Sequence, residues 1–204
     1  MEARPEFTDS RTYWEQRYAA GGDSGRGSYD VLADFKSEVL NRFVAEHGIT
    51  TVVELGCGDG NQLSLAAYPS YIGLDVAPSA IDRCLAAFGD DPTKSFFLYD
   101  PERFVDRHGI FRRELAMSLD VVFHLVEDEV FDRYMTTLFD CASRFVCIYS
   151  SNDERPDIGQ HVRNRRFTPW VEQHRADWTM VEHVPNPHRG TIEGAISDFW
   201  FYAR

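Results

Sequence analysis

The segment 52–61 constrains the fold of this chain more than any other part of the sequence. Val52–Leu55 is largely apolar and runs directly into three alternating glycines, Gly56, Gly58 and Gly60. Such glycines permit positive φ angles and carry no Cβ, so the backbone can contact a ligand, and a helix that starts there offers unpaired N–H donors. The segment therefore predicts a buried strand, a ligand-binding turn and the start of a helix.

A second apolar segment ends in a carboxylate. Tyr71–Asp75 is apolar until Asp75, which stands 15 residues after Gly60. In an open α/β sheet, ligands bind outside the carboxyl ends of the strands, and an acid there can accept hydrogen bonds from ribose hydroxyls. Together the two segments predict a nucleoside site.

Strand and helix patterns alternate through most of the chain. Apolar runs predict strands at 51–55, 71–75, 95–99, 115–119, 145–149, 179–184 and 196–202, and apolar stripes predict helices at 12–20, 32–48, 78–88, 127–139 and 168–174. We therefore expect a doubly wound, mostly parallel α/β sheet of seven strands with helices on both faces. A short connection before the last strand favours antiparallel pairing there. The length of 204 residues fits a single domain.

Four motifs resemble those of the class I S-adenosylmethionine-dependent methyltransferases. Residues 54–60, 74–75, 96–100 and 118–125 are similar to the first, second, third and fourth motifs of that family. In the fourth, Asp120 and His124 match an acid and a histidine of ubiquinone-type O-methyltransferases, with aspartate in place of the usual glutamate. The resemblance implies a Rossmann-like methyltransferase domain over 1–204, with 1–30 as an N-terminal helix and lid, and S-adenosyl-L-methionine as cofactor.

The resemblance also implies a role for each motif. The glycine turn, fixed by Glu54, would approach the methionine part of the cofactor. Asp75 would take the ribose hydroxyls, and Asp100 would neighbour the adenine amine. Asp59 could order the turn or attract the cofactor's amino group, and both roles stay open. The predicted cofactor-binding residues are Tyr18, Glu54, Gly56, Cys57, Gly58, Asp59, Gly60, Asp75, Val76, Asp100, Pro101, Ser118, Leu119 and Asp120.

Two histidines are candidate catalytic residues. Methyl transfer needs a base only when the acceptor must lose a proton. His124 follows the fourth predicted strand, and an unperturbed pKa near ~6.5 suits proton transfer at neutral pH. In the family the matching histidine mostly shapes the site, so both roles stay open. His161 is a second candidate base or a solvated loop histidine.

An aromatic segment near the amino terminus is a candidate lid. Tyr13, Trp14 and Tyr18 precede the glycine-rich segment 21–28. Aromatic faces attract cations such as a sulfonium, and glycines permit hinge motion. The alternative is that these rings pack on the sheet without moving.

The charge of the chain favours small-molecule substrates. The 21 Lys and Arg against 33 Asp and Glu give a formal charge of −12, which repels nucleic acid on average. The basic segment 161–167 could clamp a carboxylate or phosphate of an anionic acceptor, or pair with surface acids. We expect a small-molecule acceptor, with oxygen preferred and nitrogen and carbon open. The sequence does not indicate an oligomeric state.

The four cysteines show no metal-like spacing and lie in or beside apolar runs, which is typical of reduced core thiols, so no metal site is expected. No secretory signal or membrane-spanning run is seen. We expect a cytoplasmic protein that does not bind membranes.

Three other functions compete with this interpretation. A nicotinamide-binding fingerprint requires a third glycine where Asn61 stands. A non-catalytic S-adenosylmethionine-binding sensor or scaffold stays open, and a cavity filled by Trp170, Trp178 or Trp200 would favour it. An aminopropyl-transferring relative is less favoured, because no further paired acids suit a polyamine.

Overall fold

One seven-stranded sheet organises the chain, in the order β3-β2-β1-β4-β5-β7-β6. The computed structural model describes residues 7–156, 159–192 and 195–204. The strands are β1 (Val52–Leu55), β2 (Tyr71–Asp75), β3 (Lys94–Leu98), β4 (Arg113–Leu119), β5 (Ala142–Ser150), β6 (Thr179–Val184) and β7 (Asp198–Ala203). β1 to β5 pair in parallel, and β7 is antiparallel to both β5 and β6. The predicted fold class is confirmed.

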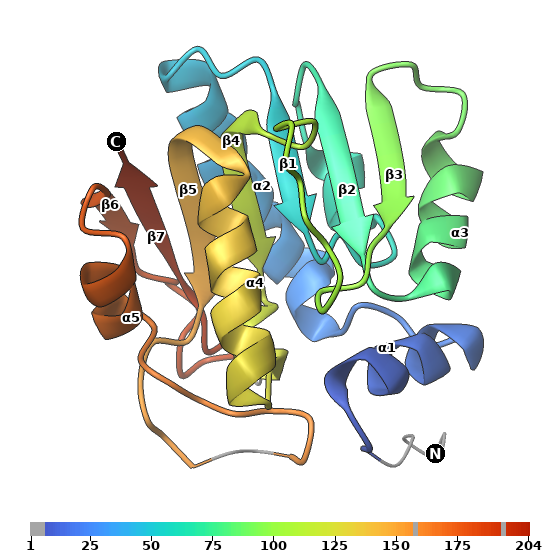
Figure 1. Ribbon diagram of the computed structural model, residues 1–204. Helices are drawn as coiled ribbons and strands as arrows, with labels where there is room; N and C mark the ends of the chain where they lie inside the picture. Colours follow the sequence, from blue (N-terminus) through green and yellow to red (C-terminus); the bar gives the residue numbers. More distant parts are fainter. Residues whose placement is uncertain (1–6, 157–158, 193–194) are drawn as a thin grey trace.

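Helices cover both faces of the sheet. α2 (Asp30–Glu46) and α3 (Pro78–Phe88) pack on one face, and α4 (Asp128–Asp140) and α5 (Thr168–His174) on the other (Figure 1). Successive side chains of a strand point to opposite faces, so a strand between two helical layers must be apolar on both. In β1, Val53 and Leu55 join the core with α4, while Val52 joins the core with α2.

α1 (Ser10–Ala19) lies outside these layers, across the carboxyl ends of the strands at the lower edge of the view (Figure 1). The Asp9 carboxylate caps it by accepting from the Thr12 N–H at 2.8 Å. The hydroxyl of Ser10 donates to the carbonyl of His124 at 2.9 Å and to the carboxylate of Glu127 at 2.7 Å. These bonds tie α1 to the chain that follows β4.

The helix predicted to start at the glycine turn does not form. Only the 3-10 helix η2 (Gln62–Leu65) follows the turn. The chain must return to the start of β2 at Tyr71, and Pro69 disfavours helical geometry just before it. Two further 3-10 helices are η1 (Arg26–Ser28) and η3 (Val122–His124). Within the described ranges, none of the helices combines the length and apolar character needed to cross a membrane.

Candidate active site

The glycine turn is closely packed against its neighbours. Gly56, Gly58 and Gly60 have φ angles of 83°, 58° and 79°, in the region that favours glycine. A Cβ on Gly56 would lie 2.5 Å from Cγ2 of Val121, and one on Gly58 would lie 2.4 Å from Oγ of Ser24. The turn therefore brings bare backbone to the end of β1, and side chains at these positions would clash with Val121 and Ser24.

The carboxylate of Asp75 is held by backbone groups at the end of β2. Its Oδ2 accepts from the Gly58 N–H and its Oδ1 from the Ala77 N–H, both at 2.9 Å. Burial raises the pKa of Asp75 to about 6, although these hydrogen bonds act in the opposite direction. Each oxygen keeps a second lone pair, so the carboxylate can still accept from a diol.

A cavity of about 610 Å³ opens at the carboxyl ends of β1 to β4, between the strand ends and α1. This volume is within the ordinary range for small-molecule sites. Most of the predicted site residues line it: Tyr18, Glu54, Gly56, Cys57, Gly58, Asp59, Asp75, Val76, Asp100, Pro101, Leu119, Asp120 and His124.

Three predicted site residues lie behind the cavity wall instead. A Cβ on Gly60 would lie 2.9 Å from an aromatic carbon of α3. Ser118 is fully buried in β4, where its Oγ lies 2.7 Å from the hydroxyl of Tyr134. The ring of His161 stacks on that of Tyr13 with centroids 4.5 Å apart. These residues pack around the cavity and are not among the described residues that line it.

Asp120 is the centre of a largely buried polar cluster that includes Lys36, which was not among the predicted site residues. It adopts a φ of 57°. Its Oδ2 accepts from the ammonium of Lys36 at 3.1 Å, and its Oδ1 from the hydroxyl of Ser197 at 2.6 Å. Lys36 is fully buried and lines the cavity. It lies four residues from both Leu32 and Leu40 on the buried stripe of α2. A lysine on an otherwise apolar stripe is the sequence feature that could have identified Lys36 as a site residue.

His124 faces the cavity with a defined tautomer. Its Nδ1 lies 2.8 Å from the carbonyl of His161, and because a carbonyl only accepts, Nδ1 carries the proton. Burial lowers the pKa of His124 to about 4. The imidazole is therefore neutral at pH 7, with Nε2 as a proton acceptor. The Trp14 ring packs edge-on against it at a centroid distance of 4.8 Å.

The amino-terminal segment closes one side of the cavity. Trp14 and Tyr18 of α1 line it. The carboxylate of Asp59 accepts from the Ser24 N–H and from the Tyr29 hydroxyl, each at 2.8 Å. Partial burial alone would raise the pKa of Asp59, but the hydrogen bonds lower it below its ordinary value. Of the two roles that the sequence left open for Asp59, its contacts are those of a residue that orders the turn and ties it to the cover.

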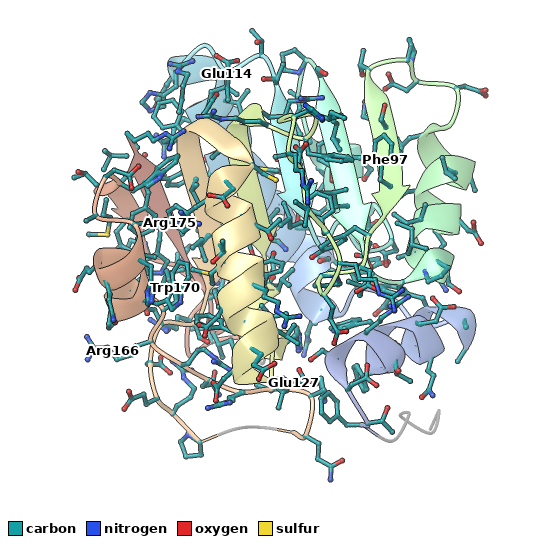
Figure 2. The ribbon with its side chains drawn as sticks, viewed as in Figure 1. Phe97, Glu114, Glu127, Arg166, Trp170 and Arg175 are labelled. Atoms are coloured by element: carbon teal, nitrogen blue, oxygen red, sulfur yellow. The ribbon has the colours of Figure 1, made fainter. Side chains whose placement is uncertain are left out.

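The arginines of the basic segment lie outside the lining of the cavity. Arg163 and Arg165 each pair with Asp128 at 2.9 Å, and Arg165 also donates to the carbonyl of Leu125 at 2.7 Å. Figure 2 shows Arg166 projecting from the surface on the side away from α1. None of the three is among the described residues that line the cavity. The alternative of pairing with surface acids is correct for Arg163 and Arg165.

The tryptophans that would fill the cavity of a scaffold protein lie elsewhere. Trp178 is 7% exposed in the core below α4, and Trp200 stacks on His183. Trp170 of α5 packs beside α4 and donates to Asp132 at 2.9 Å (Figure 2). The cavity's described lining includes none of these three side chains.

Comparison with solved structures identifies the fold. The N-methyltransferase NodS from Bradyrhizobium japonicum WM9, in complex with S-adenosyl-L-homocysteine, aligns with a TM-score of 0.77 and 17% identity, over 97% of this chain and 99% of NodS. Magnesium protoporphyrin IX methyltransferase (ChlM) from Synechocystis PCC 6803 with bound SAM gives 0.70 and 13%, over 98% and 99%. The small RNA methyltransferase HEN1 gives 0.66 and 18%, over 89% of this chain and 26% of HEN1.

No family model and no curated protein sequence matches the chain. The structural alignments nevertheless cover almost the whole of the chain. The chain has the fold of the class I S-adenosylmethionine-dependent methyltransferases, which confirms the resemblance seen in the motifs at the level of the fold.

Proposed function

We propose that this protein is an S-adenosylmethionine-dependent methyltransferase that acts on a small molecule. The observation that carries the proposal is the cavity at the carboxyl ends of β1 to β4, bounded by a glycine turn and by the carboxylates of Asp75 and Asp100. NodS and ChlM, which share the fold, were crystallised with S-adenosyl-L-homocysteine and with S-adenosylmethionine.

The residues present fit this cofactor. Gly56 and Gly58 line the cavity with bare backbone, because a Cβ at either position would clash with Val121 or with Ser24. Asp75 has lone pairs left for the ribose hydroxyls. Asp100, with Val76 and Pro101 on the same wall, is suited to the adenine.

Methyl transfer depends mainly on how the protein aligns the acceptor with the methyl group of the cofactor. When bound, the cofactor supplies a methyl group on a sulfonium, which a nucleophile attacks in line. Holding two reactants in line can contribute about 7–11 kcal/mol. Trp14 and Tyr18 would exclude water from the reacting atoms. His124 is neutral, and its Nε2 can accept a hydrogen bond from an acceptor hydroxyl. Because burial lowers its pKa to about 4, it is a weak general base and is better suited to orienting the acceptor than to deprotonating it.

The acceptor is proposed to be a small metabolite, with oxygen preferred as the methylated atom. The carboxylates of the cavity wall and the net charge of −12 do not suit a polyanionic substrate. The basic segment does not favour an anionic acceptor, because Arg163 and Arg165 are paired with Asp128. We further propose one domain over 1–204 with residues 1–30 as its cover, of which 1–6 lie outside the described residues. A cytoplasmic location is proposed because all four cysteines are free thiols.

Methyl transfer itself tests the proposal. The protein is incubated with methyl-labelled S-adenosylmethionine and a low-molecular-weight metabolite extract, and in parallel with total RNA. Label is expected in small molecules and in much smaller amount in RNA, and His124→Gln should reduce it. Transfer to RNA alone would contradict the small-molecule proposal, and no label in either fraction would count against a methyltransferase.

A further inference from the structure

β3 and the segments that flank it form a long exposed stretch at one edge of the sheet. Of residues 85–112, only Tyr99 is buried. β1 and β2 are buried over their whole length, whereas no residue of β3 is buried. β3 is the last strand of the sheet on the α3 side (Figure 1). Because a protein–protein interface of standard size uses about 20–30 residues a side, this stretch is large enough to form one.

The connection from β3 to β4 leaves apolar side chains uncovered. Parallel strands are usually joined by a crossover that contains a helix, but residues 99–112 contain none (Figure 1). Phe97 is 42% exposed, although its ring contacts that of Phe111 at a centroid distance of 5.2 Å. Val105 and Ile110 are 69% and 63% exposed, more than any other large apolar side chain among the described residues. Apolar side chains that gather at a surface in this way mark an interaction site.

The outer edge of β3 presents unpaired backbone groups. The Thr93 carbonyl accepts from β2 at 2.9 Å, and the Tyr99 N–H donates to β2 at 3.0 Å. Because the residues of a strand direct their backbone groups to its two sides in turn, the even-numbered residues of β3 face away from β2. The N–H groups of Phe96 and Leu98 and the carbonyl of Lys94 therefore point outward, where the described residues supply no further strand.

The other edge of the sheet is protected, and β3 is not. In β6 the register shifts between Met180 and Glu182, and Glu182 forms an ion pair with Arg42. Bulges and charged side chains are means by which edge strands avoid pairing with another chain. In β3 the register is unbroken, and residues 96–98 are three consecutive apolar residues. β3 is therefore the edge that is open to a further strand.

The charge of this surface favours a second copy of the same chain. Residues 85–112 carry four basic and five acidic side chains, a net charge of −1, out of −12 for the whole chain. The basic residues are Lys94, Arg103, Arg107 and Arg112, and the acidic residues are Asp90, Asp91, Asp100, Glu102 and Asp106. Two copies repel each other less at a nearly neutral surface of mixed charge than at the acidic remainder of the chain. An antiparallel pair of identical strands is also self-complementary, as a two-fold interface requires.

We propose that β3 pairs with β3 of a second copy in antiparallel orientation, about a two-fold axis at Phe96. The N–H of Phe96 donates to the carbonyl of the partner's Phe96, and the N–H of Leu98 donates to the carbonyl of the partner's Lys94. The two sheets form one continuous sheet, and the exposed apolar side chains of each connection 99–112 lie beside the partner. This interface goes beyond the proposed function and does not depend on it.

Sedimentation equilibrium and hydrogen exchange of the full wild-type chain test the proposal. We expect twice the mass of one chain, with a dissociation constant in the micromolar range or below, as for an interface of standard size. The amides of Phe96 and Leu98 should be protected from exchange in the dimer and should lose this protection on dilution to the monomer. The amide of Phe97, which faces β2, should stay protected in both states.

A matched pair of variants locates the interface. Leu98→Lys would place a charge opposite the partner's Lys94, and like charges directly opposite each other in an antiparallel pair are destabilising. We expect it to weaken the dimer by more than about tenfold, because like charges that meet across an interface are costly. Met180→Lys makes the same change on β6 at similar exposure, 48% against 50% for Leu98, and should leave the dissociation constant unchanged.

Two kinds of result would overturn the proposal. A wild-type chain that sediments as a monomer at every concentration excludes a second copy, and the surface would then fit a different protein. A dimer in which Phe96 and Leu98 exchange freely, or which Met180→Lys weakens as much as Leu98→Lys does, has its interface elsewhere. The wild-type measurements need no variant, so a Leu98→Lys protein that fails to fold does not remove the test. None of these results bears on cofactor binding, which is measured separately.

Discussion

The two walls of the cavity are built in different ways. The strand-end wall consists of the glycine turn after β1, Asp75 at the end of β2, and Asp100 two residues beyond β3. Its key carboxylate, Asp75, is held by backbone N–H groups. The side-chain wall consists of Lys36, Gln62, Asp120 and His124 with α1. Its hydrogen bonds join segments that are far apart in the sequence, because Lys36 and Ser197 both donate to Asp120. The first wall follows from local sequence, whereas the second depends on the fold.

The largest expected effect is at the strand-end wall. Gly56→Ala would place a Cβ 2.5 Å from Val121 at a φ of 83°, so the turn cannot keep its shape. We expect binding of S-adenosyl-L-homocysteine to fall by more than about 100-fold, since the cost combines a steric clash with backbone strain. Isothermal titration calorimetry measures it. Gly48→Ala is the control, because Gly48 has a φ of 58° but nothing within 4 Å of its Cβ. Equal losses in both variants would mean that the turn has no special role.

The next effect concerns Asp75. Asp75→Asn removes a charged acceptor, and we expect about 10- to 100-fold weaker binding at pH 7.5. Burial raises the pKa of Asp75 to about 6 in the free protein, and a diol requires the ionised form. Wild-type affinity should therefore be constant above pH 6 and fall as the pH drops below it. In Asp75→Asn this pH dependence should be absent, and its persistence would contradict the assignment.

The two walls differ in how far sequence alone can predict them. The strand-end wall was predictable because each residue is placed by the strand before it, and the bounds of β2, α3 and β6 agree with the apolar patterns. Gln62 and the contact between Lys36 and Asp120 were not, because a helical stripe shows that Lys36 is buried but not what it meets. The helix expected after the glycine turn failed for a similar reason, since the return to β2 leaves room only for η2.

A smaller effect tests how the cover is attached to the turn. Asp59→Ala removes the bonds to Ser24 and Tyr29, so residues 10–29 should lose protection from hydrogen exchange. S-adenosyl-L-homocysteine binding should weaken by about three- to tenfold, as for one or two lost hydrogen bonds. Asp23→Ala, which removes an exposed pair with Arg17, serves as the control. Unchanged exchange in Asp59→Ala would show that the cover is held by packing alone.

Substitution of Glu54 is expected to have the smallest effect on binding, but its effect on stability should be measurable. Burial raises its pKa to about 7, so the folded protein keeps a proton that the unfolded chain releases near pH ~4.3. The contribution of Glu54 to stability therefore falls as the pH rises from about 4 to 7. Glu54→Gln should gain on the order of 2 kcal/mol in the free energy of unfolding at pH 8 and little at pH 4. Urea unfolding at both values measures it.

Glu114 provides a control of opposite sign for that measurement. Hydrogen bonds from Thr50 and Arg144 lower its pKa to about 2, so its contribution is present at neutral pH and lost in acid. Glu114→Gln should therefore lose stability at pH 8. A gain in the free energy of unfolding in both variants would mean that the gain in Glu54→Gln does not come from the burial of its carboxylate.

The cavity at the ends of β1 to β4 is proposed to hold an adenosyl thioether or sulfonium. Calorimetric titration of the full chain with S-adenosyl-L-homocysteine, with NAD in parallel, measures this binding. We expect one-to-one binding of S-adenosyl-L-homocysteine, lost in Gly56→Ala, and no heat from NAD. Binding of NAD with no response to S-adenosyl-L-homocysteine would contradict it.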